Sequence, residues 1–223
     1  MDIFVPPRWF VQLWRSTVGR KALVAASGLL LGIWVVLHVA GNLTLFSGPA
    51  AADGYAAALR TTPAALWAAR AGLVAAAVVH VAGVVSLARA DRAARPRHQA
   101  PARRASTMAA RTMRVGGALL LAFVVYHLLH LTVGLFHPGF LAGHVYDNVV
   151  RGLRPTWVAS IYVAAAVLLG LHLFHGLWAA ARSLGVWPEG AARRRRPAVA
   201  LVSVAVALGF ASVPLAVLAG WLR

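Results

Sequence analysis

Uncharged, hydrophobic stretches dominate the chain and recur five times along it. Between Lys21 and Asp53 lie 31 residues without a formal charge, and between Arg70 and Arg89 lie 18. A helix needs about 20 apolar residues to cross a hydrocarbon core of about 30 Å. Continuous apolar runs without alternation indicate helices rather than barrel strands. We therefore predict an all-α membrane protein with five transmembrane helices, near residues 22–46, 64–88, 115–136, 157–182 and 198–222.

Two further features of the pattern complete the expected organisation. Residues 8–21 combine basic side chains with Trp9 and Trp14, which is typical of a short helix lying in the membrane interface. The longest hydrophilic segment, about 89–114, is rich in Arg, Ala and Pro and has no pattern of a soluble domain. We expect one membrane domain over residues 1–223.

The composition agrees with a membrane location and excludes several chemistries. Hydrophobic residues make up 61% of the chain and charged residues only 12%, whereas a soluble domain carries about 25% charged residues. The chain has no cysteine, which excludes iron–sulfur clusters, thiolate zinc sites and covalently attached haem within it.

The basic residues predict the direction of the helices. The net charge is +17, and 17 of the 22 Lys and Arg residues fall before the first span, between the second and third, or between the fourth and fifth. Cytoplasmic loops collect Lys and Arg, so we expect a cytoplasmic N-terminus and an outer C-terminus. This distribution favours topology and attraction to membrane lipid over nucleic-acid binding.

Histidines inside the predicted spans are the main candidates for chemistry, because polar side chains at membrane depth are costly and usually functional. Counted from the inner end, His38 lies at about 24 Å and His127 at about 18 Å, whereas His80 lies at about 12 Å and His172 at about 15 Å. If the first four spans form an up-down bundle, spans 1 and 3 hold an outer pair and spans 2 and 4 an inner pair. His130 and His175, each three residues further on, compete for the same roles.

Pairs of imidazoles indicate haem more than zinc. Zinc takes four ligands, or three and water, whereas two histidines on opposite faces complete six-coordinate haem iron. Each histidine would bind through Nε2 and donate its other N–H to a carbonyl one turn back, that of Trp34 for His38. Small residues in the spans either make room for such a group or only let helices pack closely; they are Gly28, Gly32, Gly41, Gly83, Gly134, Gly170 and Gly176.

Several short motifs carry a resemblance to a known family. They are Ser-Thr-Val-Gly-Arg-Lys at 16–21, Ser27-Gly28, His38-Val-Ala-Gly-Asn42, Arg111-Thr-Met-Arg114, Tyr126-His127-Leu-Leu, and Gly170-Leu-His172-Leu-Phe-His-Gly-Leu-Trp178. Together they resemble the dihaem cytochrome b subunit of bacterial succinate dehydrogenases and fumarate reductases. That subunit is a single-chain, five-helix membrane anchor, and the resemblance covers essentially the whole chain.

The resemblance implies a division of labour among residues and subunits. It implies two haem b groups, an outer one held by His38 and His127 and an inner one held by His80 and His172. The partners would be an iron–sulfur subunit and a flavoprotein with FAD, which alone carries the dicarboxylate site. Electrons would pass to or from a quinone, with menaquinone as the expected type, in the bacterial cytoplasmic (inner) membrane. The residues expected near haem or quinone, with lipid headgroups as the alternative for the basic ones, are His130, His175, Arg15, Arg20, Lys21, Arg89 and Arg182.

Some alternatives stay open at this stage. The predicted spans contain no Asp or Glu, so a proton path through them would use histidine, tyrosine, water or propionates. In the outer loop, His137, His144, Tyr146 and Asp147 would either serve a quinone or be plain loop residues. Other readings of the whole chain are the cytochrome b anchor of a hydrogenase or formate dehydrogenase, a histidine-based transporter, and an anchor without haem.

Overall fold

The computed structural model describes residues 7–94, 107–137, 139–186 and 192–223, and these residues form helices and turns without a strand. Most of the arginine-rich connection between the second and third spans, residues 95–106, lies outside the described residues. The helices are α1 Arg8–Arg15, α2 Thr17–Leu43, α3 Pro49–Arg60, α4 Pro63–Ala93, α5 Thr107–His127, α6 Val145–Leu153, α7 Thr156–Ser183 and α8 Ala192–Leu218.

Five of these helices are long and apolar enough to cross a membrane, which confirms the predicted number of spans. They are α2 with its short 3₁₀ extension Thr44–Ser47, α4, α5 with its extension Leu128–Val133, α7 and α8. Large apolar side chains cover their outer surface, with Trp67 65% exposed and Leu201 71% exposed. A surface this apolar is stable against lipid and not against water.

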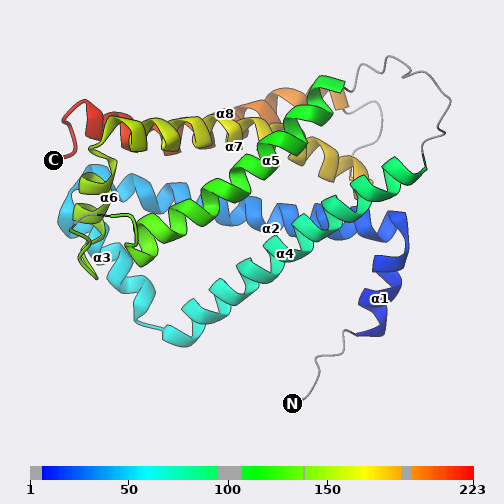
Figure 1. Ribbon diagram of the computed structural model, residues 1–223, viewed down its shortest axis with the longest axis horizontal. Coiled ribbons are helices and arrows are strands. Elements are labelled where there is room, and N and C mark those ends of the chain that lie inside the picture. Colours follow the sequence, from blue (N-terminus) through cyan, green and yellow to red (C-terminus); the bar gives the residue numbers. More distant parts are fainter. Residues whose placement is uncertain (1–6, 95–106, 138, 187–191) are drawn as a thin grey trace.

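The long helices lie side by side, and the short ones lie at the two ends (Figure 1). The N-terminal helix α1 and the ends of α4 and α7 are at one end, which carries most of the basic residues that the structure describes. The opposite end holds α3, α6 and the C-terminus.

The end opposite α1 has a core of its own, which the sequence did not predict. Leu45, Tyr146, Val150 and Leu153 pack there with the last turns of α8. The backbone N–H of Tyr146, at the start of α6, donates to Asp53 of α3 over 3.0 Å. This bond satisfies one of the free N–H groups at a helix N-terminus and joins the two short helices.

The predicted interfacial helix over 8–21 is two elements. It breaks at Ser16, whose extended backbone ends α1 and whose Oγ accepts the N–H of Gly19 over 2.8 Å as the cap of α2. Gly19 has no Cβ and lies directly against the Leu13 carbonyl, so the two helices meet at a tight corner. Residues 17–21 therefore belong to the first span.

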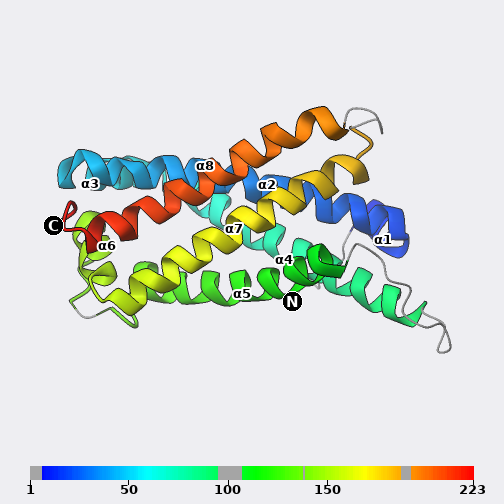
Figure 2. The same cartoon turned by 90° about the horizontal axis from the view of Figure 1, so that it is seen from above.

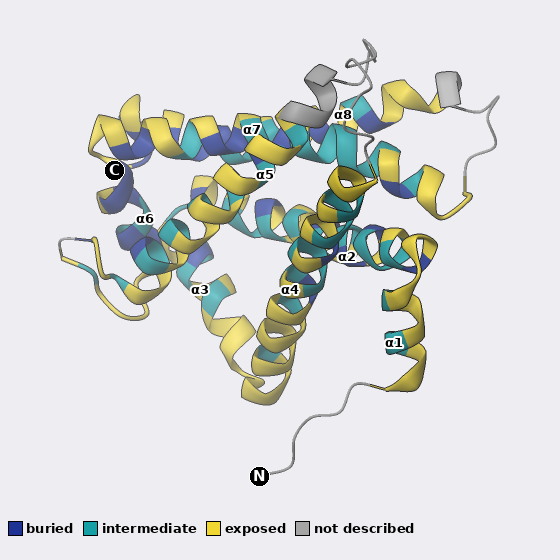
Figure 3. Cartoon of the chain, turned by 45° about the vertical axis from the view of Figure 1, so that its right-hand side comes forward, coloured by how far each residue is buried: buried dark blue, intermediate teal, exposed yellow. Residues whose placement is uncertain are grey.

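The packing of the bundle decides where side chains can meet across it. Helix α2 packs closely against α4, α7 and α8, and α5 packs closely against α7 (Figure 2). The closely packed pairs in the described part of the chain do not include α2 with α5, or α4 with α7. Figure 3 shows the result: α7 and α8 carry many buried positions, whereas most of α4 is exposed.

Candidate functional site

The inner pair of histidines joins two helices that are not closely packed. The rings of His80 on α4 and His172 on α7 face each other with centroids 6.3 Å apart and planes at 67°. The Nδ1 atom of His80 lies 3.1 Å from the carbonyl oxygen of Val24 on α2. A carbonyl only accepts, so Nδ1 carries the proton and the Nε2 lone pair of His80 is free.

A glycine makes this position of His80 possible. A Cβ at Gly28, one turn after Val24 on α2, would lie 2.9 Å from Cε1 of His80. Any larger residue at 28 would push the ring away from α2. The acceptor for His80 is thus a carbonyl of the neighbouring helix, and the prediction of a carbonyl one turn back on the same helix is wrong for this residue.

The outer pair also consists of two facing rings on helices that are not closely packed. The rings of His38 on α2 and His127 on α5 lie 5.9 Å apart with planes at 76°. Trp34 stacks on His38 at 6.0 Å and 9°, and the ring of Phe210 on α8 lies 5.6 Å from it. Trp34 therefore supports His38 with its ring, one turn back on the same helix.

The two pairs lie at different depths. Gly28 marks the level of His80 on α2, and His38 lies ten residues further along the same helix. At 1.5 Å per residue the two levels are about 15 Å apart.

These residues fit two haem groups. Two imidazole nitrogens that bind one metal at about 2 Å each put their ring centroids roughly 6 Å apart, which both pairs match. Each pair also contains a buried ring nitrogen without a hydrogen-bond partner, Nδ1 of His127 and Nδ1 of His172. Iron on Nε2 would leave these Nδ1 atoms unpaired, so the spacing of the rings is what supports the fit, and neither ring is held through Nδ1 as His80 is. Within the described ranges, no three His, Asp or Glu side chains converge as zinc would require.

His130 belongs to a different cluster. It is 1% exposed, its Nδ1 lies 2.9 Å from the hydroxyl of Tyr162 on α7, and its ring stacks on Tyr126 and on His137. His137, which the sequence left open as a plain loop residue, is buried there with Nε2 2.6 Å from the carbonyl oxygen of Asn148. Tyr162 also packs against the ring of His127 at 5.8 Å, so this cluster adjoins the outer pair.

His175 is not part of the inner pair either. Its ring contacts Phe174 on the same helix. Together with His172 it lines a largely apolar groove of about 250 Å³ between α5 and α7. Among the histidines predicted in the spans, the structure thus brings together the first member of each competing pair.

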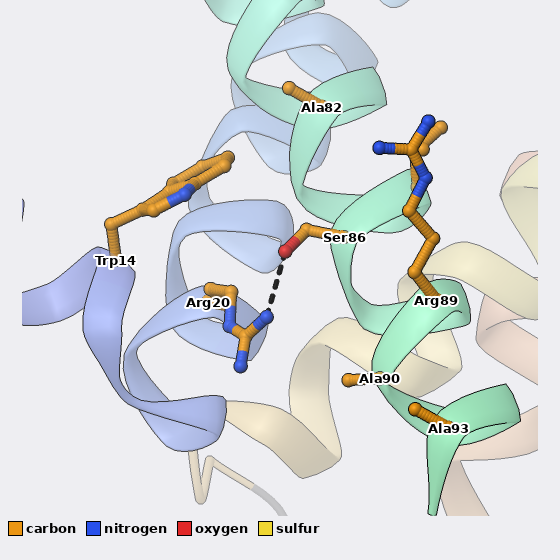
Figure 4. Close-up of a pocket in the computed structure, with 8 residues that line it drawn as sticks. Trp14, Arg20, Ala82, Ser86, Arg89, Ala90 and Ala93 are labelled. Carbon is orange, nitrogen blue, oxygen red and sulfur yellow. Dashed lines mark hydrogen bonds between the residues drawn. The ribbon is translucent and has the colours of Figure 1, made fainter.

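The basic candidates divide into two sets. Arg20 and Arg89 line a pocket of about 630 Å³ between α1, α2 and α4, where Arg20 donates to the Ser86 hydroxyl over 2.7 Å (Figure 4). Arg15, at the end of α1, Lys21 and Arg182 are exposed, near the same end of the bundle.

Three of the seven glycines singled out in the spans lie in close contacts between helices. Gly83 accommodates the side chain of Val24, Gly170 lies against Ala207 and the Ser203 carbonyl, and Gly41 lies against Tyr55. A Cβ at Gly32 would meet only Leu173, and at Gly176 it would meet nothing within 4 Å. Gly28 alone in this set touches one of the paired histidines, and Gly134 ends the third span in the left-handed region, at φ 77°.

Sequence reasoning missed the partners Val24, Tyr162 and Ser86. Ser86 and Arg89 are three residues apart on α4, a spacing that places them on one face. Val24 acts through its backbone carbonyl, so no side-chain pattern reveals it.

The fold and the site define a multi-pass helical membrane protein with facing histidine pairs at two depths in its interior. Residues 88–211 match the model of a protein family, the succinate dehydrogenase/fumarate reductase transmembrane subunit. The match covers more than half of the chain, so the chain belongs to this family. It includes His127 and His172, whereas His38 and His80 precede it. Comparisons with curated proteins and with solved structures found no significant match.

Proposed function

We propose that this membrane anchor subunit is a dihaem cytochrome b, which passes electrons between an iron–sulfur subunit and quinone. The family membership supports the assignment to a succinate dehydrogenase or fumarate reductase. One observation carries the haem part: two imidazole pairs at haem-like separation, about 15 Å apart in depth, each joining helices that do not pack closely together.

In this proposal each histidine has a defined task. His38 and His127 would hold the outer iron, and His80 and His172 the inner iron. Val24 fixes the ring orientation and the tautomer of His80 by accepting its Nδ1–H, which presents Nε2 to the metal. Contacts with the rings of Trp34 and Phe210 orient His38.

Haem iron with two histidine ligands, when bound, transfers single electrons and leaves no coordination position for a substrate. The chain's own residues then supply binding, orientation and exclusion of water. The spans contain the paired imidazoles in an apolar shell, and no dicarboxylate site is proposed in this chain. That site would lie on the FAD-containing flavoprotein, with the iron–sulfur clusters on the second partner subunit.

The proposed setting is the bacterial cytoplasmic membrane, with α1 and the basic end of the bundle inside. Lys21 and Arg182 at that end are proposed to neutralise haem propionates, since exposed cations on the inner side suit such anions. The quinone is proposed to be menaquinone. His130 and His175 adjoin the two pairs without belonging to them, and we propose that they act near haem or quinone and not as iron ligands.

The experiment is a reduced-minus-oxidised spectrum of the purified chain with a redox titration. We expect b-type bands, two haems per chain and two midpoint potentials. His80→Ala and His172→Ala should each remove the same potential, and His38→Ala and His127→Ala the other.

His130→Ala and His175→Ala are the matched controls, because each removes an imidazole three residues from a proposed ligand. Both should keep two haems. A colourless wild-type preparation would overturn the proposal, and loss of a haem in either control would overturn the ligand assignment for that pair.

A further inference from the structure

The pocket between α1, α2 and α4 is separate from both histidine pairs. On α4, Arg89 lies nine residues after His80 and Ser86 lies six, so at 100° per residue they are about 180° and 240° around the helix from His80. His80 faces α2 and α7, whereas Arg89 points away from it and Ser86 contacts Arg20 near the start of α2, beside α1. A ligand in this pocket would therefore be distinct from any group held by the histidine pairs.

The positive charge of the two arginines favours an anionic ligand in the pocket. Arg20 and Arg89 both line it. Arg20 donates through Nη1 to Ser86 and through Nε to the Ser16 carbonyl, which leaves Nη2 available. Neither arginine has a carboxylate partner among the described residues. Guanidinium groups bind phosphate oxygens through paired, charge-assisted hydrogen bonds. Figure 4 shows the two arginines with Ser86 between them.

The apolar side chains that line the pocket favour a ligand with both a charged group and an apolar part. Trp14 of α1 forms one wall, and tryptophan is enriched where headgroups meet hydrocarbon. The small side chains of Ala82, Ala90 and Ala93 line α4 and leave its volume of about 630 Å³ open, within the roughly 300–1,000 Å³ typical of small-ligand sites.

The face of α4 continues from the pocket as an apolar surface toward the middle of the membrane. Val78 is 61% exposed and Val85 42%, and both lie within about 60° of Arg89 around the helix. A phosphate at the arginines would thus sit above a surface suited to acyl chains. A free phosphate would leave that surface unused.

We propose that this pocket is a binding site for one anionic phospholipid, whose phosphate contacts Arg20 and Arg89 and whose acyl chains lie along α4. The site would fix the corner between α1 and α2 at the membrane surface. It does not depend on haem binding, because none of the residues that line the pocket belongs to the histidine pairs.

The test uses the complex of this chain with its partner subunits, purified in detergent and washed. Retained phospholipid is counted by mass spectrometry for the wild type, Arg20→Gln and Arg89→Gln. The matched control is Arg92→Gln, which removes the same charge from the same helix one turn on, outside the pocket. We expect the two pocket variants to bind phosphatidylglycerol roughly tenfold more weakly, as loss of one charge-assisted bond implies, and the control to match the wild type.

Further measurements distinguish a bound lipid from a free phosphate ion. Nanodiscs of phosphatidylcholine with and without phosphatidylglycerol, and with inorganic phosphate, distinguish a lipid from a free ion. Ser86→Ala, which keeps both charges, should weaken retention less than Arg20→Gln and guards against misfolding as the cause.

Three outcomes would overturn the proposal. In the first, Arg20→Gln and Arg92→Gln retain equal phosphatidylglycerol. In the second, inorganic phosphate displaces the lipid and binds without it. In the third, Arg20→Gln or Arg89→Gln loses a haem or the iron–sulfur subunit and keeps its lipid, which would assign the arginines to that partner. Two haems per chain in the pocket variants are expected, and haem content is read independently of lipid.

Discussion

Val24 and Gly28 lie one turn apart on α2, and together they fix the ring of His80. The carbonyl of Val24 accepts from Nδ1 at 3.1 Å, and the missing side chain of Gly28 leaves the ring its space. The Val24 carbonyl orients the imidazole, and the absence of a side chain at Gly28 leaves room for it. At this scale the site depends as much on a backbone oxygen and an absent Cβ as on the histidine.

Substitution of Gly28 tests this dependence. In Gly28→Val the new side chain would displace the His80 ring from Val24, so we expect loss of the inner haem and retention of the outer one. The measurement is haem per chain with a redox titration. Gly176→Val is the control, because a Cβ there meets nothing within 4 Å, and it should keep both haems. Two haems in Gly28→Val would contradict the described role of the glycine.

At the scale of the element, the third span ends in an unusual way. After His127 the helix widens into a π-helical turn, Leu128–Val133, which carries His130 into the buried cluster with Tyr162. Gly134 stops it at φ 77°, and the Leu135 N–H returns to the Leu129 carbonyl over 2.9 Å. π-Helical turns often occur at functional sites, and this one lies next to the outer histidine pair.

Two glycines with similar left-handed backbones, Gly134 and Gly185, distinguish the cost of backbone strain from the cost of crowding against Phe140. Gly185, after α7, has φ 67° and open space around its missing Cβ, whereas a Cβ at Gly134 would meet the Phe140 ring. We expect Gly185→Ala to lower the free energy of unfolding by about 1–2 kcal/mol, the cost of a left-handed residue. Gly134→Ala should lower it further, by about another 1–3 kcal/mol for overpacking. Unfolding titrations in mixed detergent micelles measure both, and equal losses would show that Phe140 moves aside freely.

At the scale of the whole molecule, the arrangement is polarised from end to end. One end joins α1 to the basic ends of the long helices, and the other closes over a small hydrophobic core of α3, α6 and α8. A charge asymmetry of this kind sets the direction in which helices insert. The basic end is therefore expected in the cytoplasm.

The absence of cysteine from the chain makes this orientation directly testable. Thr61→Cys, between α3 and α4, should react with a membrane-impermeant maleimide in intact cells. Ser183→Cys, the last residue of α7, should react only after the membrane is opened. Both positions are exposed, so accessibility differs only by side. The reverse labelling pattern would invert the topology.

The five spans follow from the sequence alone, because a hydrocarbon layer accepts only long apolar helices and imposes that length on the chain. The sequence did not predict α3 and α6, whose packing depends on contacts such as Asp53 with Tyr146, 93 residues away. It also joined residues 8–21 into one helix, since the corner at Ser16 depends on a close approach that only the folded chain contains.

In the candidate site too, some features follow from the sequence and others only from the tertiary structure. Counting residues along the spans put His38 and His127 in the outer half of the membrane and His80 and His172 in the inner half, and the ligand role assigned to them stays a prediction. Whether His127 or His130 faces α2 is a matter of helix rotation, and the tertiary structure decided it by turning His130 toward Tyr162 and His137. The sequence determined composition, spans and depth, because these are properties of one helix against the bilayer. The structure decided the facing partners and the separate basic pocket, because these depend on how helices pack against one another.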